Sequence, residues 1–184
     1  TMDSDLADGI AETVLKSVMK NLPIALKEPD NYSARANLMA DSSIACSGIP
    51  EYGKASTGWP CHAMEHELSA YYDITHGVGL AILTPRWMRY IVEKDPACKE
   101  RFVKFAKNVM GLDGEDEDAL IQHSIDDLEQ FFKDCGIPST LTELNITDEY
   151  FEEMAKHANR NNRLANAYVP LTVEDIVNIY KNCL

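Results

Sequence analysis

Closely spaced cysteine pairs are missing from this chain of 184 residues. Its five cysteines are scattered, odd in number and free of any C-x-x-C motif. Structural disulfides are therefore not expected, and the pattern fits a protein of a reducing cytoplasm.

Positive charge is also scarce. The chain has 17 lysines and arginines against 30 aspartates and glutamates, a formal net charge of −13, and no stripe of basic residues. Such a surface repels phosphate groups, so neither nucleic acid nor an anionic membrane is an expected partner. We also expect no secretory signal peptide and no membrane span, since no apolar run approaches about eighteen residues.

Hydrophobic residues are as frequent as in an ordinary globular protein, at 45% of the chain. The length suits one domain, and we expect residues 1–184 to form it. The first residues are T-M-D-S, with methionine in second place, which predicts that the chain is a fragment of a longer protein.

Helical periodicity runs through the whole sequence and predicts an all-α, irregular multi-helix bundle. Pro23 is expected to bend or end the first helix near Asn21, Ile44 and Ala45 to face inward, and Thr147 to cap the seventh helix. The apolar run from Val78 to Leu83 resembles a strand in isolation, but no second run exists to pair with it. The expected helices are Asp5–Lys27, Ser33–Ser47, Trp59–Tyr72, His76–Glu93, Asp95–Met110, Ala119–Cys135, Thr147–Asn159 and Thr172–Cys183.

Three of the five histidines, His62, His66 and His76, gather within fifteen residues. A neutral imidazole needs both a donor and an acceptor partner, so a cluster of them indicates a binding function. His123 and His157 stand apart on charged helical patterns and are expected to be boundary or surface residues.

Spacing alone places His62 and His66 on one face of a helix, one turn apart. His76 would lie about 21 Å from His62 on an unbroken helix. The two can share a site only if the chain reverses in the polar segment between Tyr72 and Thr75. Gly79, like Gly77, would then allow a close approach of backbone or ligand.

The segment H-A-M-E-H, from His62 to His66, also matches the H-x-x-E-H pattern of inverted zinc metallopeptidases. In those enzymes both histidines bind zinc and the glutamate activates water. Three fixed positions in five residues are a weak signal, and this hypothesis leaves His76 without a role. Cys61 adjoins His62 but is expected to serve in packing.

The longer pattern G-W-x-x-H-x-x-E-H-x-L-S-A-x-Y-D-I-x-H-G-x-G-L-A-I-L, from Gly58 to Leu83, resembles the metal-site signature of the iron-containing, group III alcohol dehydrogenases. The resemblance is nearest to the NAD(P)H-dependent butanol dehydrogenase branch. It implies a two-domain enzyme with an α/β nucleotide-binding domain followed by a dehydroquinate synthase-like helical domain. The present chain would be the helical domain alone.

Carried onto this sequence, the resemblance assigns two metal ligands to His62 and His76. It assigns His66 to proton transfer beside the nicotinamide, as both a catalytic and a cofactor-binding residue. The family's other two ligands, an Asp and a His, have no counterpart here and are expected upstream of Thr1. Glu65 is expected either to orient an imidazole or to be a surface charge.

Spacing favours His62 with His66 as the metal pair, whereas the resemblance pairs His62 with His76. We follow the resemblance, because it also accounts for the glycines. It implies Fe(II) or Zn(II), NAD(P)H in the full-length enzyme, a primary alcohol or aldehyde substrate, the missing nucleotide-binding domain as partner, and a homodimer as in many relatives. The alternatives are the zinc metallopeptidase and a noncatalytic helical domain.

Overall fold

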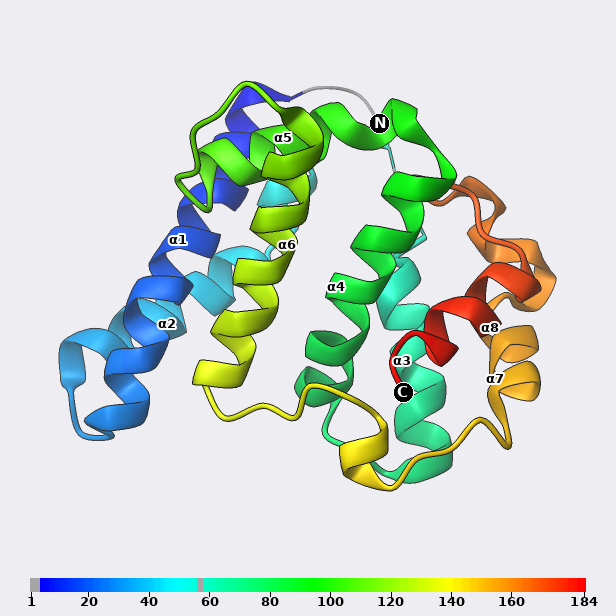
Figure 1. The fold of residues 1–184 in the computed structure, drawn as a ribbon. Coiled ribbons are helices and arrows are strands. Elements are labelled where there is room, and N and C mark those ends of the chain that lie inside the picture. Colours follow the sequence, from blue (N-terminus) through cyan, green and yellow to red (C-terminus); the bar gives the residue numbers. More distant parts are fainter. Residues whose placement is uncertain (1–3, 56–57) are drawn as a thin grey trace. The chain divides into compact units, whose positions relative to one another are not determined.

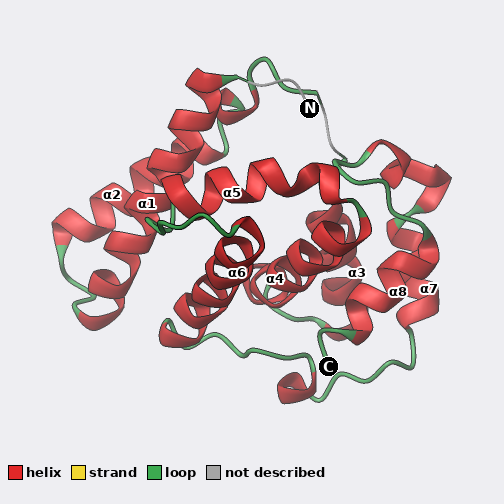
Figure 2. Ribbon diagram, turned by 45° about the horizontal axis from the view of Figure 1, so that its top comes forward, coloured by secondary structure: helices red, strands yellow, loops and turns green. Residues whose placement is uncertain are grey.

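Helices and loops make up the computed structural model, which describes residues 4–55 and 58–184. Within these ranges no residue is in a strand (Figure 2). The all-α prediction is confirmed, including the helical state of residues 78–83.

Eight α-helices and four short 3₁₀ helices follow one another along the described chain (Figure 1). The α-helices are α1 (Asp5–Lys27), α2 (Tyr32–Ala45), α3 (Pro60–Tyr72), α4 (His76–Lys94), α5 (Lys99–Asn108), α6 (Glu117–Asp134), α7 (Phe151–Ala158) and α8 (Val173–Lys181). The 3₁₀ helices are η1 (Ile49–Glu51), η2 (Pro96–Cys98), η3 (Thr142–Leu144) and η4 (Arg160–Asn166).

The described residues form two structural units. Unit 1 consists of residues 4–55 and 101–124, and unit 2 consists of residues 58–100 and 125–184. All three clustered histidines belong to unit 2.

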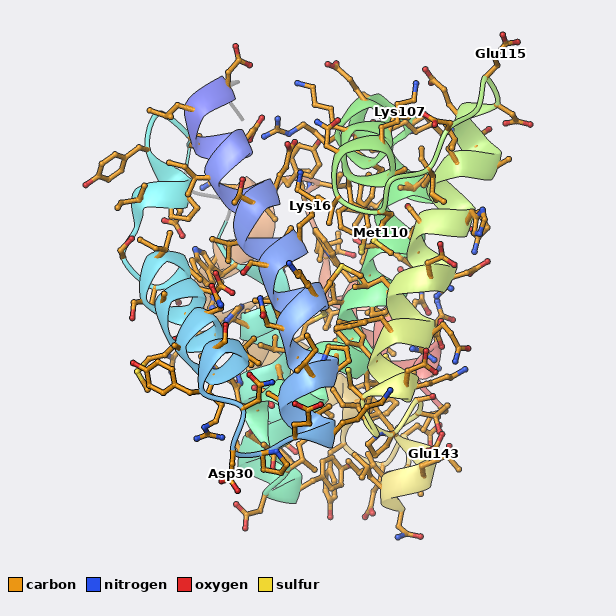
Figure 3. All side chains as sticks on the ribbon, turned by 90° about the vertical axis from the view of Figure 1, so that its left-hand side faces the viewer. Lys16, Asp30, Lys107, Met110, Glu115 and Glu143 are labelled. Carbon is orange, nitrogen blue, oxygen red and sulfur yellow. The ribbon has the colours of Figure 1, made fainter. Side chains whose placement is uncertain are left out.

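Unit 1 is dominated by the hairpin of α1 and α2, which lie side by side. Asp30 lies at the turn between them (Figure 3). Asn31 begins α2 by accepting a hydrogen bond from the backbone N–H of Ala34 at 3.0 Å, which satisfies a donor that the helix itself leaves free. Asp8 of α1 binds Arg101 and Lys54, each at 2.5 Å at the nearest approach.

One prediction about this hairpin is confirmed and one is wrong. The helix α1 runs from Asp5 to Lys27 as expected, and it continues through Pro23 without ending near Asn21. A proline removes one backbone donor, and the turns on either side keep their own hydrogen bonds. Ile44 and Ala45 are exposed rather than inward, because the last turn of α2 lies where few neighbours cover it.

Unit 2 is built from α3, α4, α7 and α8, which pack against one another. The hydroxyl of Tyr180 on α8 donates to the backbone carbonyl of Met64 on α3 at 2.7 Å. The Phe151 ring of α7 lies 5.2 Å from the Tyr180 ring. Large side chains that are fully buried in this core include Leu68, Ile82, Leu83, Ile91, Met154 and Leu171.

The N-terminal cap of α8 is the one that the sequence predicts. Thr172 and Asp175 form a reciprocal capping box, and Asp175 also accepts hydrogen bonds from Tyr90 and Lys94 of α4. The expectation for α7 is wrong, because this helix begins at Phe151 and not after Thr147. The N–H of Phe151 bonds to the carbonyl of Asp148 at 3.2 Å, which makes this segment a turn.

Within the described residues, no helix combines the length and the apolar character that a membrane crossing requires.

Candidate metal centre

Two consecutive helices carry the histidine cluster. His62, Glu65 and His66 lie on α3, and His76 is the first residue of α4. Asp73 ends α3 with a left-handed backbone, at φ 52°, so the chain turns back within the predicted segment. Thr75 holds the N-cap position of α4 without a side-chain hydrogen bond.

The turn brings the three imidazoles together. The ring centroids of His62 and His76 are 5.2 Å apart, those of His66 and His76 are 5.2 Å apart, and those of His62 and His66 are 6.2 Å apart. A ring centroid lies about 3.2 Å from an ion that the ring nitrogen binds, so two imidazoles at a tetrahedral angle stand roughly 5 Å apart. The cluster therefore fits a divalent metal ion.

The protonation of His62 suits metal binding. Its partial burial lowers its pKa below the ordinary value of 6.5, and the neighbouring His76 and His66 lower it further, while Glu65 opposes them. The ring is thus neutral at pH 7, and a neutral imidazole is the form that binds metals.

Glu65 is fully buried, with 0% of its side chain exposed. One carboxylate oxygen accepts a hydrogen bond from the Ser69 hydroxyl at 2.7 Å. The other is paired with Nδ1 of His76. Of the two expectations for Glu65, the structure thus excludes the surface charge and agrees with an imidazole partner.

Gly79 gives this carboxylate its space. A Cβ atom at residue 79 would lie 2.7 Å from both Cγ and Oε1 of Glu65, whereas a Cβ at Gly77 would meet nothing within 4 Å. The predicted close approach is confirmed for Gly79, whereas at Gly77 no described protein atom comes that near and the predicted approach of a ligand stays a prediction.

Distances alone do not select the metal pair. Ligand atoms of Glu65, His66 and His76 lie within 4.8 Å of one another, as a group that leaves out His62. His76 nevertheless has both His62 and His66 as neighbours at the same ring distance. The assignment of His62 and His76 as ligands and of His66 to proton transfer stays a prediction.

Burial of Glu65 argues against the metallopeptidase reading. A glutamate that activates water needs a carboxylate oxygen open to that water, but Glu65 is fully buried and its two oxygens are engaged by Ser69 and His76. The hypothesis of a noncatalytic helical domain would be favoured if His62 and His76 were far apart or each bonded to backbone groups. The first of these conditions is not met, because the two rings are neighbours.

The remaining residues singled out in the sequence play structural or surface parts. Burial raises the pKa of Cys61 to about 12, against a smaller opposing effect of Thr84, so this thiol stays protonated and serves in packing. His123 and His157 are exposed. His157 pairs with Glu67 at 3.4 Å.

The sequence analysis did not identify Trp59 as a neighbour of His62. Its ring meets the His62 ring edge to face, with centroids 4.6 Å apart, and its backbone is left-handed at φ 51°. This tryptophan lies between Gly58 and Pro60, and that G-W-P sequence at a helix start was the available signal.

The chain is similar to a known protein family and to two named butanol dehydrogenases. Residues 1–184 match the family model described as "Fe-containing alcohol dehydrogenase family, C-terminal". The chain is 47% identical over 176 residues to NADH-dependent butanol dehydrogenase A of Clostridium acetobutylicum, a match that covers 95% of this chain and 44% of that protein. It is 44% identical over 185 residues to butanol dehydrogenase B of the same organism, covering 98% of this chain and 46% of the relative.

A solved structure agrees with these matches. The crystal structure of NADH-dependent butanol dehydrogenase A from Thermotoga maritima superposes with a TM-score of 0.86 at 34% identity, over 98% of this chain and 46% of that one. The chain thus spans about half the length of the relatives it matches.

Proposed function

This chain belongs to the Fe-containing alcohol dehydrogenase family, and on that premise we propose that it is the metal-binding helical part of an NAD(P)-dependent alcohol dehydrogenase. The proposed reaction interconverts a primary alcohol and an aldehyde by hydride transfer. The names of the butanol dehydrogenase relatives support a short-chain alcohol as substrate.

The observation that carries this proposal is the convergence of His62 and His76. Their rings come from two helices and lie 5.2 Å apart, and His62 is neutral at pH 7. In the proposal these two residues hold the ion. Imidazole together with carboxylate ligation suits Fe(II) and Zn(II) alike.

A divalent metal supplies Lewis acidity toward an alcohol oxygen, and a nicotinamide cofactor accepts the hydride. In the proposal, His66 takes up the hydroxyl proton and releases it to solvent. The exposure of its ring and the 5.2 Å between its ring and that of His76 support this role.

The nucleotide-binding part and two further ligands, an Asp and a His, belong in this proposal to the rest of a longer protein. The chain as given is accordingly proposed to bind metal weakly and to lack dehydrogenase activity. Its five unpaired cysteines support a reducing cytoplasm as the compartment in which the protein functions.

Titration with Zn(II) against a chromophoric chelator tests the proposed ligands. His62→Ala and His76→Ala should each weaken Zn(II) affinity by on the order of tenfold or more, because each removes one of two protein ligands. His66→Ala should leave the affinity near that of the unsubstituted chain. His123→Ala is the control for loss of an exposed imidazole outside the cluster.

The same experiment separates this proposal from its alternative. Loss of Zn(II) affinity in His66→Ala with retention in His76→Ala would favour the metallopeptidase arrangement. Alcohol-dependent reduction of NAD(P) by the unsubstituted chain would contradict the proposed inactivity.

A further inference from the structure

The carboxyl group of Glu65 has no exposed surface. Burial of a charge without partners is strongly unfavourable. Glu65 is stabilised by two donors from different parts of the turn, the hydroxyl of Ser69 and Nδ1 of His76. The Ser69 oxygen also lies 3.1 Å from the carbonyl oxygen of Ile74, so its single hydrogen has acceptors in both the carboxylate and the loop that leads into α4.

The contact with the Glu65 carboxylate determines which ring nitrogen of His76 can bind a cation. A carboxylate only accepts hydrogen bonds, so the Nδ1 that faces Glu65 must carry a hydrogen. When the ring is neutral, as metal binding requires, Nε2 is then the nitrogen without a hydrogen, and it lies on the side of the ring away from Glu65. An anion behind the ring also makes Nε2 a stronger donor of its lone pair to a cation.

We infer that Glu65 is a positioning residue for the metal site, which holds His76 in the Nδ1–H tautomer and directs Nε2 toward the cation. The inference rests on the proposed function, because it takes His76 as a ligand. Gly79 is the second member of this arrangement. It is the residue of α4 whose missing side chain leaves room for the carboxylate, since a Cβ there would overlap Glu65.

A pair of glycine substitutions tests the inference with a matched control. Gly77 and Gly79 both lie in the first turns of α4, so alanine raises helix propensity at both sites. Only Gly79→Ala places a methyl group against Glu65. We expect Gly79→Ala to weaken Zn(II) affinity by roughly 10–100-fold, the usual range for loss of a residue that orients a ligand, and Gly77→Ala to leave it unchanged.

A second pair keeps the inference testable if Gly79→Ala does not fold. Glu65→Gln preserves the shape of the side chain but removes its charge, and it should weaken Zn(II) affinity by about tenfold. Glu67→Gln, two residues along the same helix, should have no effect on Zn(II) affinity.

The tautomer of His76 provides a measurement that would not change if Glu65 had only a structural role. Long-range ¹⁵N–¹H spectra of the metal-free chain should show His76 as the Nδ1–H tautomer, and Gly79→Ala should shift the His76 nitrogen signals while Gly77→Ala does not. Far-ultraviolet circular dichroism checks that each variant keeps its helices.

The outcomes separate the two proposals. If His76→Ala loses Zn(II) affinity while Glu65→Gln and Gly79→Ala retain it, the positioning role is wrong and the proposed function stands. If His76→Ala retains full affinity, His76 is not a ligand, and both proposals fail. Loss of affinity in all three variants with normal controls supports the inference.

Discussion

The two structural units differ in how they bury their side chains. In the described residues, the largest fully buried side chains all belong to unit 2, among them Tyr180, Phe151, Met64 and Leu68. The α1/α2 hairpin of unit 1 buries only Ala7, Asn21 and Ala34. It also exposes large apolar side chains such as Leu6 and Met39, at 78% and 71%.

This contrast is consistent with the location of the candidate metal centre in unit 2. Imidazoles that must converge on one ion have to be held within a fraction of an ångström. A densely packed core provides such rigidity, because its side chains have few alternative arrangements. The two helices that carry the histidines, α3 and α4, are core elements of unit 2 and supply several of its fully buried side chains.

The largest expected effect is on the core of unit 2. Leu68→Ala on α3 should lower the free energy of unfolding by about 3–4 kcal/mol, because Leu68 is fully buried. Leu15→Ala on α1 is the matched control, since Leu15 is 44% exposed, and it should cost less than about 1 kcal/mol. Urea denaturation measures both, and equal costs would remove the contrast between the units.

A smaller effect is expected for two ion-paired carboxyl groups, Asp175 of unit 2 and Asp8 of unit 1. Burial alone would raise the pKa of Asp175, but hydrogen bonds from Lys94, Thr172 and Tyr90 bring it down to about 2. Burial likewise opposes Arg101 and Lys54 at Asp8, and these partners lower its pKa to about 2.

Both carboxyls stabilise the folded chain only when ionised. The unfolded value is about 3.9, so the stabilisation is complete above about pH 4 and is lost as the pH falls toward 2. At pH 7, Asp175→Asn should cost about 2 kcal/mol, since it weakens a buried network, and Asp8→Asn about 1 kcal/mol, as for a more solvated ion pair. Each variant should also lose part of the acid sensitivity between pH 4 and pH 2. A larger cost at Asp8 would contradict the ranking of the units.

The sequence predicted those features that depend on local chemistry. Periodicity placed most helices, the Thr172 and Asp175 pattern predicted the cap of α8, and the spacing of the histidines required the reversal after Tyr72. The wrong expectations at Ile44 and Thr147 concern residues whose state depends on the packing around them. An apolar residue or a threonine gives the same local signal whether or not packing covers it.

Glu65 shows the same limit within the site. From the sequence alone, Glu65 could be either the partner of an imidazole or a surface charge. Only the packing of α4 against α3, at Gly79, shows that its carboxylate is enclosed.

The most direct measurement of the central claim is the crystal structure of the Zn(II)-loaded chain, with the ion located by its anomalous signal. The account predicts one ion at about 2.0–2.2 Å from a ring nitrogen of both His62 and His76, with Glu65 still bonded to Nδ1 of His76 and His66 outside ligand distance. An ion held by His62 and His66, with His76 turned away, would contradict it.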